Sequence, residues 1–205
     1  MLNLGETFPN FTAQSTAGTI NLYDYLADKW ALLLSHPSDF TPVCTTEIGR
    51  LSQLNNEFDK RNVKVLLISC DSVDDHNKWA QDVSHYCQCQ VPYPIIGDQS
   101  GTIANMIGML DKGSDKMITV RAVFVISPDK RVKAIISYPA STGRNMNEIL
   151  RLIDSLQLTA KRTDVVTPVD WKVGGDLIVK PGANIEGQRV VDLPSGKDYL
   201  KFVNN

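Results

Sequence analysis

The order of strand-like and helix-like segments restricts the fold of this chain more than any other feature. Residues 30–34 and residues 63–69 are short apolar runs typical of buried strands, and a helical pattern lies between them. A strand, helix, strand order favours parallel pairing, because two parallel strands need a long crossover connection. We therefore expect a parallel strand pair at the centre of the fold.

Later segments add helices and a hairpin to this pair. Apolar spacing predicts helices after Cys44, with Ile48, Leu51, Leu54 and Phe58 on one face, and at residues 74–83, 103–110 and 146–156. The strand-like residues 122–126 and 132–138 flank turn residues and predict a hairpin. A hairpin beside parallel strands indicates a mixed sheet. The predicted fold class is α/β, with a mixed central sheet flanked by helices.

Composition changes after residue 159. Residues 160–205 contain Pro168, Pro181 and Pro194, several glycines and only short apolar runs. We expect residues 1–159 to form the main domain, including an N-terminal extension over residues 1–29. The remainder is expected to be a small, irregular or β-rich extension that would fold poorly alone, or simply a tail packed on its own chain.

Cys44 lies where the first predicted strand gives way to a helix. Thr41 can cap this helix, and Pro42 suits its first position. The Cys44 thiol would then lie among unpaired N–H groups at the positive end of the helix dipole. A thiolate, the nucleophilic form of cysteine, is favoured there. The alternative is a half-buried structural cysteine at the start of a helix.

The residues around Cys44 carry a family resemblance. Pro37, Thr41 and Cys44 fit the peroxiredoxin pattern Pro-x-x-x-Thr/Ser-x-x-Cys, and the string at residues 35–47 resembles the one-cysteine, or peroxiredoxin-six-like, subgroup. Further matching strings lie at residues 121–126, 138–145, 167–171 and 193–197. The resemblance covers essentially the whole chain. It implies a thioredoxin-like fold with a small C-terminal extension domain that reaches across to a partner subunit, so a homodimer is expected.

The same resemblance implies a thiol-dependent peroxidase that forms a cysteine sulfenic acid on hydrogen peroxide or organic hydroperoxides. Displacement on the weak O–O bond needs an aligned thiolate and donors for the leaving oxygen. The resemblance assigns the nucleophile to Cys44, a hydrogen bond to peroxide to Thr41, shielding of the thiolate to Pro37 and a fixed positive charge to Arg121. Without it, Thr41 is a helix cap, Pro37 ends a strand and Arg121 is a surface arginine.

Two further residues are expected to support this site. Glu47 lies three residues after Cys44 on nearly the same helical face, and we expect it to orient Arg121. An acidic residue favoured in a first helical turn is the plain alternative. His36 stands where most one-cysteine relatives have a histidine, close to the active cysteine. It is expected to tune the thiol or the access of reductant, unless it is a structural histidine.

The other three cysteines give no clear resolving thiol. Cys70 ends an apolar run and is expected to be buried filler. Cys87 and Cys89 flank Gln88, a spacing too tight for the usual zinc pattern, so they are ordinary cysteines or a resolving thiol. Two-cysteine relatives carry Val-Cys-Pro near the C-terminus, but here Thr167 precedes the proline. We therefore expect an external thiol, glutathione or another, to reduce the sulfenic acid.

Some relatives in this subgroup are also phospholipases that use a Ser-His-Asp set. At the positions of the histidine and the serine this chain has Tyr23 and Lys29, and only the acidic residue, Asp129, is kept. A base and a nucleophile are therefore both missing, and phospholipase activity is not expected.

Composition excludes several other classes of protein. Net charge is −2 with no basic stripe, so we expect no nucleic-acid partner, and no segment is long and apolar enough for membrane insertion. The N-terminus resembles neither a secretory signal nor a transit peptide, which favours the cytoplasm unless a targeting segment was trimmed. No metal or cofactor is expected.

Two other functions stay open at this stage. A thioredoxin-type disulfide reductase would need Cys-x-x-Cys, but Glu47 occupies the second cysteine position. A redox-sensing or chaperone-like binding protein is harder to exclude, because peroxiredoxins can do both.

Overall fold

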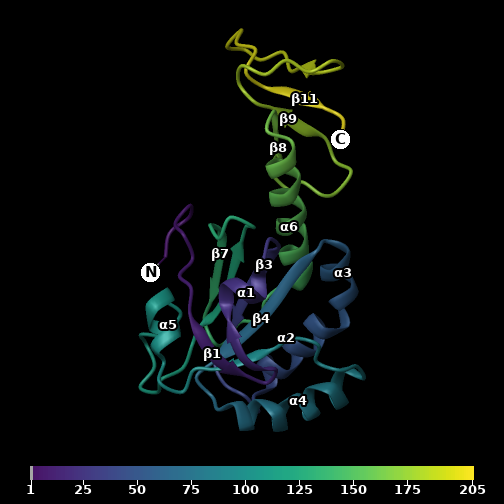
Figure 1. Cartoon of the computed structure of the whole chain (residues 1–205). Helices are drawn as coiled ribbons and strands as arrows, with labels where there is room; N and C mark the ends of the chain where they lie inside the picture. The colour runs from purple at the N-terminus through teal and green to yellow at the C-terminus, as the bar shows by residue number, and fades with distance from the viewer. Residues whose placement is uncertain (1) are drawn as a thin grey trace. The chain divides into compact units, whose positions relative to one another are not determined.

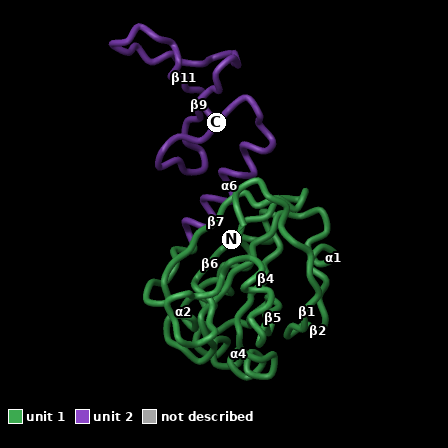
Figure 2. Tube along the Cα trace, turned by 90° about the vertical axis from the view of Figure 1, so that its left-hand side faces the viewer, with its two compact units in different colours: residues 1–146 green, residues 147–205 purple. Residues whose placement is uncertain are grey.

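The computed structural model describes residues 2–205, and the chain divides into two compact units, residues 1–146 and 147–205 (Figure 2). Composition suggested a boundary after residue 159. The C-terminal helix α6 (Met146–Lys161) instead groups with the second unit, where Leu158 packs against the small core of that unit.

The first unit is built on a seven-stranded sheet with the order β2-β1-β5-β4-β3-β6-β7. Its strands are β1 (Thr12–Ser15), β2 (Gly18–Asn21), β3 (Trp30–Ser35), β4 (Val63–Ser69), β5 (Ile95–Gly97), β6 (Arg121–Ile126) and β7 (Val132–Tyr138). Strands β1, β3, β4 and β7 of this sheet are labelled in Figure 1. Strands β3, β4 and β5 pair in parallel, whereas β6 runs antiparallel to both β3 and β7. The predicted mixed α/β sheet is confirmed, and its arrangement is thioredoxin-like.

Helices cover this sheet. They are α1 (Leu22–Leu26), α2 (Pro42–Gln53), α3 (Asn55–Lys60), α4 (Val73–Cys87) and α5 (Thr102–Ile107). Leu26 of α1 and Ile103 of α5 join Leu33 of β3 in one buried cluster. Because side chains alternate along a strand, Leu32 and Leu34 point to the opposite face. Helices α2 and α4 pack against each other (Figure 1).

Several elements differ from the sequence expectations. The helical stretch after Cys44 breaks at Leu54, so α3 is a separate short helix. Helix α5 ends at Ile107 because Gly108 adopts φ 77°, the left-handed conformation that terminates helices. The N-terminal extension forms a hairpin, β1 and β2, that joins the sheet edge beside β5. The sequence analysis did not predict these two strands, because they are short and largely polar.

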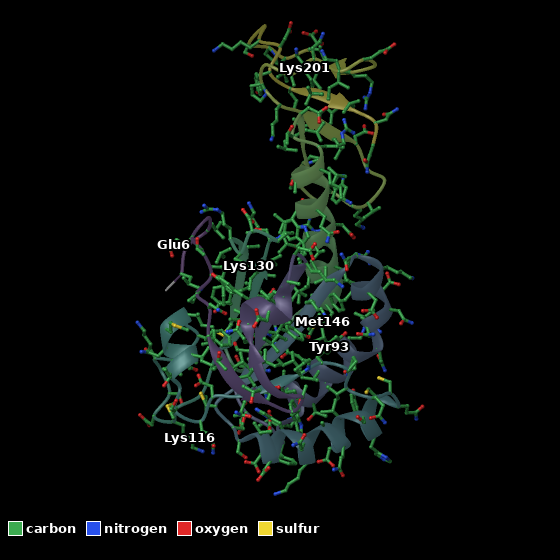
Figure 3. All side chains as sticks on the ribbon, viewed as in Figure 1. Glu6, Tyr93, Lys116, Lys130, Met146 and Lys201 are labelled. Atoms are coloured by element: carbon green, nitrogen blue, oxygen red, sulfur yellow. The ribbon has the colours of Figure 1, made fainter. Side chains whose placement is uncertain are left out.

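The segment after α4 is fixed by one aromatic side chain. Tyr93 points into the first unit, where its hydroxyl donates a hydrogen bond to the Leu51 carbonyl oxygen at 3.1 Å (Figure 3). Its ring also packs edge-on against Phe58. The chain between α4 and β5 is therefore attached to the α2–α3 region.

The second unit contains α6 and a four-stranded antiparallel sheet with the order β10-β11-β9-β8. These strands are β8 (Val165–Val166), β9 (Leu177–Val179), β10 (Arg189–Val190) and β11 (Lys201–Val203). Its buried cluster is formed by Val165, Trp171, Leu177, Val179 and Val203. The indole of Trp171 donates to the Gly175 carbonyl oxygen at 3.1 Å. The unit is thus β-rich, with a small core of its own.

Among residues 2–205, no helix combines the length and the apolar character needed to cross a bilayer.

Candidate active site

The loop at residues 36–41 connects β3 to α2 and is held by the end of β4. The Asp71 carboxylate accepts hydrogen bonds from the Ser38 hydroxyl at 3.1 Å and from the Asp39 backbone N–H at 3.0 Å. The Ser69 hydroxyl donates to the same carboxylate at 2.7 Å. These bonds join two neighbouring parallel strands at their carboxyl ends, and they fix the point at which α2 begins.

Thr41 and Pro42 lie at the start of α2, as expected, but the Thr41 side chain does not cap the helix. Thr41 occupies the N-cap position and Pro42 the first turn, yet no side chain caps the helix. The Thr41 hydroxyl instead donates to the Ser38 carbonyl oxygen at 2.8 Å. The predicted capping role of the Thr41 side chain is therefore wrong, because its hydroxyl is turned toward the loop. The first-turn N–H groups beside Cys44 are left without a side-chain acceptor.

Cys44 is fully buried in the first turn of α2, and its sulfur faces a cation. Arg121 Nη1 donates to Cys44 Sγ at 3.3 Å. Arg121 opens β6, the strand beside β3, where the Ser35 hydroxyl donates to the Val120 carbonyl oxygen and accepts from the Ala122 N–H. The thiol and the guanidinium are thus brought together across residues far apart in the sequence.

The guanidinium of Arg121 is fixed on every side. Its Nε and Nη2 both donate to the Ala140 carbonyl oxygen, at 2.9 and 2.6 Å. Its Nη1, besides facing Cys44, donates to Glu47 Oε2 at 2.8 Å. The planar donor set of arginine can make these bonds together, which the single ammonium of lysine cannot do.

Arg144 belongs to this site, although the sequence analysis gave it no role. Its side chain donates to both carboxylate oxygens of Glu47, Nε to Oε1 at 3.0 Å and Nη2 to Oε2 at 2.8 Å, and its backbone N–H donates to Oε1 at 2.6 Å. Its Nη1 donates to the Ala122 carbonyl oxygen at 2.7 Å. The sequence signal that could have identified Arg144 was the string at residues 142–145, which matches the family.

Glu47 is a buried carboxylate between two buried arginines. Burial acts to raise the pKa of Glu47, but the hydrogen bonds and charge of Arg144, and the charge of Arg121, outweigh it and hold the pKa below its ordinary value. Glu47 is therefore ionised, and it fixes the position of the arginine that faces Cys44.

Two residues of the loop before α2, His36 and Asp39, belong to a buried network of two histidines and one carboxylate. Asp39 accepts from His36 Nε2 at 2.7 Å and from His76 Nδ1 at 2.6 Å, and His76 Nε2 donates to the Ile96 carbonyl oxygen at 3.1 Å. Burial opposes the charge of Asp39, but the two histidine hydrogen bonds hold its pKa below the ordinary value. The sequence offered no signal for His76. Pro37, next to His36, is also buried.

His36 keeps one nitrogen without a partner. Burial lowers the pKa of His36, although the adjacent Asp39 acts in the opposite direction, so the ring is neutral near pH ~7. Its Nε2 donates to Asp39, which leaves Nδ1 as an acceptor. Within residues 2–205, this Nδ1 is a buried atom with no hydrogen-bond partner.

The same three residues are the ones that could hold a metal ion. The ligand atoms of His36, Asp39 and His76 lie within 4.8 Å of one another, and imidazole with carboxylate suits several transition metals. However, both Asp39 oxygens already accept hydrogen bonds from the rings. A metal ion would have to displace both bonds, so the group is better described as a buried hydrogen-bond network.

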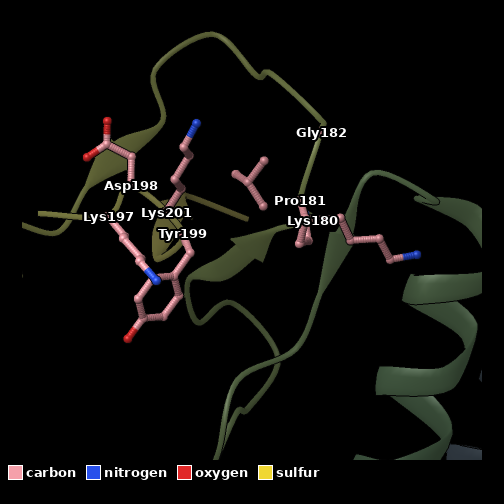
Figure 4. A pocket seen from close by; sticks show the side chains of 8 residues that line it. Lys180, Pro181, Gly182, Lys197, Asp198, Tyr199 and Lys201 are labelled. Carbon is pink, nitrogen blue, oxygen red and sulfur yellow. The ribbon is translucent and has the colours of Figure 1, made fainter. Parts of the chain in front are cut away.

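Each unit carries at least one hollow on its surface. A cleft of about 430 Å³ between α2 and α4 is lined by Phe40, Thr41, Pro42, Thr45, Thr46, Trp79, Asp82 and Tyr86. A hollow of about 320 Å³ in the second unit is lined by Val179, Lys180, Pro181, Gly182, Lys197, Asp198, Tyr199 and Lys201 (Figure 4). Only the first includes residues of the turn that carries Cys44.

The remaining thiols lack the setting of Cys44. Cys70 is half-buried, and burial, then the charges of Asp98 and Asp71, raise its pKa to about 11. It therefore carries little thiolate at neutral pH. Cys87 ends α4, which extends beyond the predicted residue 83, and its sulfur contacts that of Cys89.

The residues at the phospholipase positions are used in other ways. The Tyr23 hydroxyl donates to the Phe8 carbonyl oxygen at 2.6 Å. Asp129, in the turn between β6 and β7, accepts a hydrogen bond from the Ser127 hydroxyl. Lys29 lies just before β3.

Comparisons with known proteins agree on one family. The model of the AhpC/TSA family matches residues 4–135. The "1-Cys peroxiredoxin" of Dictyostelium discoideum is 48% identical over 203 residues, which cover 98% of this chain and 84% of that protein.

Solved structures give the same result. A cysteine-to-serine mutant of the peroxiredoxin 6 of Arenicola marina matches with a TM-score of 0.96 at 46% identity, covering 100% of this chain and 98% of that one. A yeast mitochondrial 1-Cys peroxiredoxin, described as resolved through glutathione/thioredoxin systems, matches with a TM-score of 0.89 at 40% identity over 100% of both chains.

We expect Glu47→Gln to lower the free energy of unfolding by about 3 kcal/mol near neutral pH, because two buried arginines lose their counter-charge. The folded-state pKa of Glu47 lies below its ordinary value of 4.5, so its contribution is full above pH 4.5 and is lost as pH falls through the folded value. Urea unfolding followed by circular dichroism should therefore give a difference between wild type and variant that shrinks below pH ~4.5.

The control is Glu57→Gln, which changes a glutamate paired with Lys60 and Arg61 at the surface. It should have little effect, since exposed ion pairs contribute little to stability. A Glu47→Gln difference that is the same at acid and neutral pH would contradict the assigned ionisation.

Proposed function

The chain belongs to the AhpC/TSA family, among its peroxiredoxins, and we propose that Cys44 is the peroxidatic nucleophile of this thiol-dependent peroxidase. The activity is the reduction of hydrogen peroxide and organic hydroperoxides through a cysteine sulfenic acid. The observation that supports the role of Cys44 most directly is the 3.3 Å contact between its buried sulfur and Arg121 Nη1.

In the proposed reaction, the Cys44 thiolate attacks the distal oxygen of the hydroperoxide. The S–O bond forms as the O–O bond breaks, which leaves Cys44 as a sulfenic acid and releases an alkoxide that takes up a proton. Negative charge moves from sulfur to the leaving oxygen. A fixed cation beside the sulfur, Arg121, stabilises this charge throughout, because it needs no reorganisation during the reaction.

We propose that Thr41 holds the peroxide as an acceptor. Its hydroxyl proton is committed to the Ser38 carbonyl oxygen, so the hydroxyl oxygen can receive the hydrogen bond of the peroxide O–H. The uncapped N–H groups of the first turn of α2 are donors suited to the other peroxide oxygen. Pro37 has no N–H and is buried, which suits a role in keeping water from the thiolate.

Three further residues are proposed to support the residues that face the peroxide. Glu47 and Arg144 are proposed as positioning residues, since their ion pair sets the orientation of Arg121. His36 is proposed as a supporting residue, because it is neutral and has one free acceptor nitrogen.

We expect Cys44→Ser to abolish peroxide consumption and Arg121→Ala to lower kcat/KM by about 10²- to 10³-fold, the usual effect of losing one fixed donor to a developing charge. Stopped-flow measurement of hydrogen peroxide reduction tests both. Arg131→Ala is the matched control, because Arg131 is an exposed arginine of the first unit whose side chain is 53% accessible. Near wild-type rates in Cys44→Ser would refute the assignment of the nucleophile.

The sulfenic acid is proposed to be reduced by an external thiol, in a one-cysteine cycle. The chain has no cysteine after Cys89, and Cys70 carries little thiolate. A small thiol such as glutathione would give a mixed disulfide with Cys44 and water, and a second thiol would release Cys44. The yeast mitochondrial relative, described as resolved through glutathione/thioredoxin systems, supports this class of reductant.

After one equivalent of peroxide, Cys44 is expected to persist as a sulfenic acid that a dimedone-type probe can trap. Excess peroxide without reductant should then give sulfinic acid, which is not reversed without a dedicated repair enzyme. Mass spectrometry of the labelled peptide measures both states, with Cys44→Ser as the unlabelled control. A stoichiometric disulfide from Cys44 to Cys87 or Cys89 would instead indicate a two-cysteine cycle.

Phospholipase activity is proposed to be absent, because Tyr23 and Lys29 stand where a base and a nucleophile are needed. The purified protein should release no fatty acid from phosphatidylcholine vesicles above the background given by Cys44→Ser. Release that is lost on Asp129→Ala would overturn this proposal.

We also propose a cytoplasmic homodimer in antioxidant defence and redox homeostasis. The four cysteines are all unpaired, which is typical of proteins from reducing compartments. Residues 160–205 expose Val169, Val173, Val190 and Tyr199, apolar surface suited to a partner subunit of the 1–159 domain. Sedimentation velocity should give a dimer mass, and a monomer at micromolar concentration would contradict it.

A further inference from the structure

Two thiols outside the proposed active site lie in contact with each other. Cys87 Sγ and Cys89 Sγ are 3.1 Å apart, and both cysteines are free. A disulfide bond is about 2.05 Å long, so the two sulfurs are about 1 Å from bonding distance. Residues at i and i+2 on a helix do not face each other, so this contact requires the chain to change direction between the two cysteines.

The backbone at the end of α4 produces this contact. Cys87 is the last residue of the helix, and Gln88 adopts φ 55° and ψ 33°, the left-handed conformation that turns the chain at a helix end. Cys89 is thereby turned back toward Cys87. Gln53 Nε2 donates to the Cys87 carbonyl oxygen at 3.3 Å, and Tyr93 attaches the following segment. The two sulfurs are held together by the fold and not by chance flexibility.

A metal site does not account for the pair. Within residues 2–205, no third histidine, cysteine or acidic side chain joins these two sulfurs in a group of ligands. Two thiols that approach this closely without a metal are suited to redox chemistry.

We propose that Cys87 and Cys89 form a reversible intrachain disulfide by exchange with a small-molecule disulfide such as oxidised glutathione. The Cys89 thiolate attacks one sulfur of that disulfide, forms a mixed disulfide and releases the first small thiolate. The Cys87 thiolate then attacks the Cys89 sulfur and expels the second. The protein loses two hydrogens, and the small disulfide is reduced to two thiols.

Accessibility sets the order of these steps. Cys89 is partly exposed, whereas Cys87 is only 6% exposed, so the external disulfide meets Cys89 first. Burial, and then the contact with Cys87, raise the pKa of Cys89 to about 11. Little thiolate is present at neutral pH, so the exchange is slow, while the second step is intramolecular between sulfurs already in contact.

The pair also adjoins the helix that carries Cys44. A Cβ atom at Gly49 of α2 would lie 3.1 Å from Cys87 Cβ, so this end of α4 packs directly on α2. Gly49 is five residues after Cys44, about 7.5 Å along the helix axis. The proposed disulfide would therefore form where α4 packs on the helix that carries Cys44.

The test uses the full chain carrying Cys44→Ser and Cys70→Ser, in which Cys87 and Cys89 are the remaining cysteines. The protein is treated with oxidised glutathione at pH ~8, quenched in acid and analysed by intact-mass and peptide mass spectrometry. We expect loss of two hydrogens in the peptide that holds both cysteines, with no retained adduct, and full reversal by reduced glutathione. Because Cys44 is absent, this result does not depend on the proposed function.

Single variants in the same background separate the steps. Cys87→Ser, with Cys87→Ala as a second variant in case serine disturbs the buried position, should stop at a glutathione adduct on Cys89. Cys89→Ser should react far more slowly, and circular dichroism checks the fold of each. Cys87→Ser/Cys89→Ser in the otherwise wild-type chain should keep its peroxidase rate. A pair that stays reduced, or that retains two adducts, would overturn the proposal.

Discussion

The candidate active site depends on one buried carboxylate, that of Glu47, which is shared by Arg121 and Arg144. It joins three parts of the first unit: the first turns of α2, the start of β6 and the segment that follows β7. Burying a single arginine beside a thiol is costly, and a carboxylate that accepts hydrogen bonds from two guanidinium groups offsets much of that cost. A net positive charge is left over, and it lies next to the Cys44 sulfur. The same arrangement thus stabilises the fold and gives the Cys44 sulfur a cationic neighbour.

A second buried network serves the loop before α2. The Asp39 carboxylate links His36 on that loop to His76 on α4, while Asp71 holds the loop from the end of β4. Both oxygens of the Asp39 carboxylate are used in this network, so a change in geometry would leave a buried charge without its partners. The loop that leads to Cys44 is consequently held by the hydrogen bonds of Asp39 and Asp71. The first turns of α2 are held by the ion pairs of Glu47.

Much of this architecture could be predicted from sequence. The apolar runs of β3 and β4, the hairpin of β6 and β7, and the position of Cys44 at the start of a helix all follow from local patterns. Arg121 could be selected only by resemblance, because its contact with Cys44 joins residues that are distant along the chain. Arg144 and His76 were missed for the same reason. The side-chain direction of Thr41 and the left-handed turn at Gln88 depend on tertiary surroundings, which spacing does not encode.

The complete burial of Cys44 has a consequence for timing. Because Cys44 has no exposed surface, every reactant needs the surrounding side chains to move, and a thiol of peptide size needs a larger opening than a hydroperoxide does. Oxidation and reduction of Cys44 would therefore place different demands on the packing around the start of α2. The interval between them would then depend on how readily the start of α2 opens, as well as on the supply of reductant.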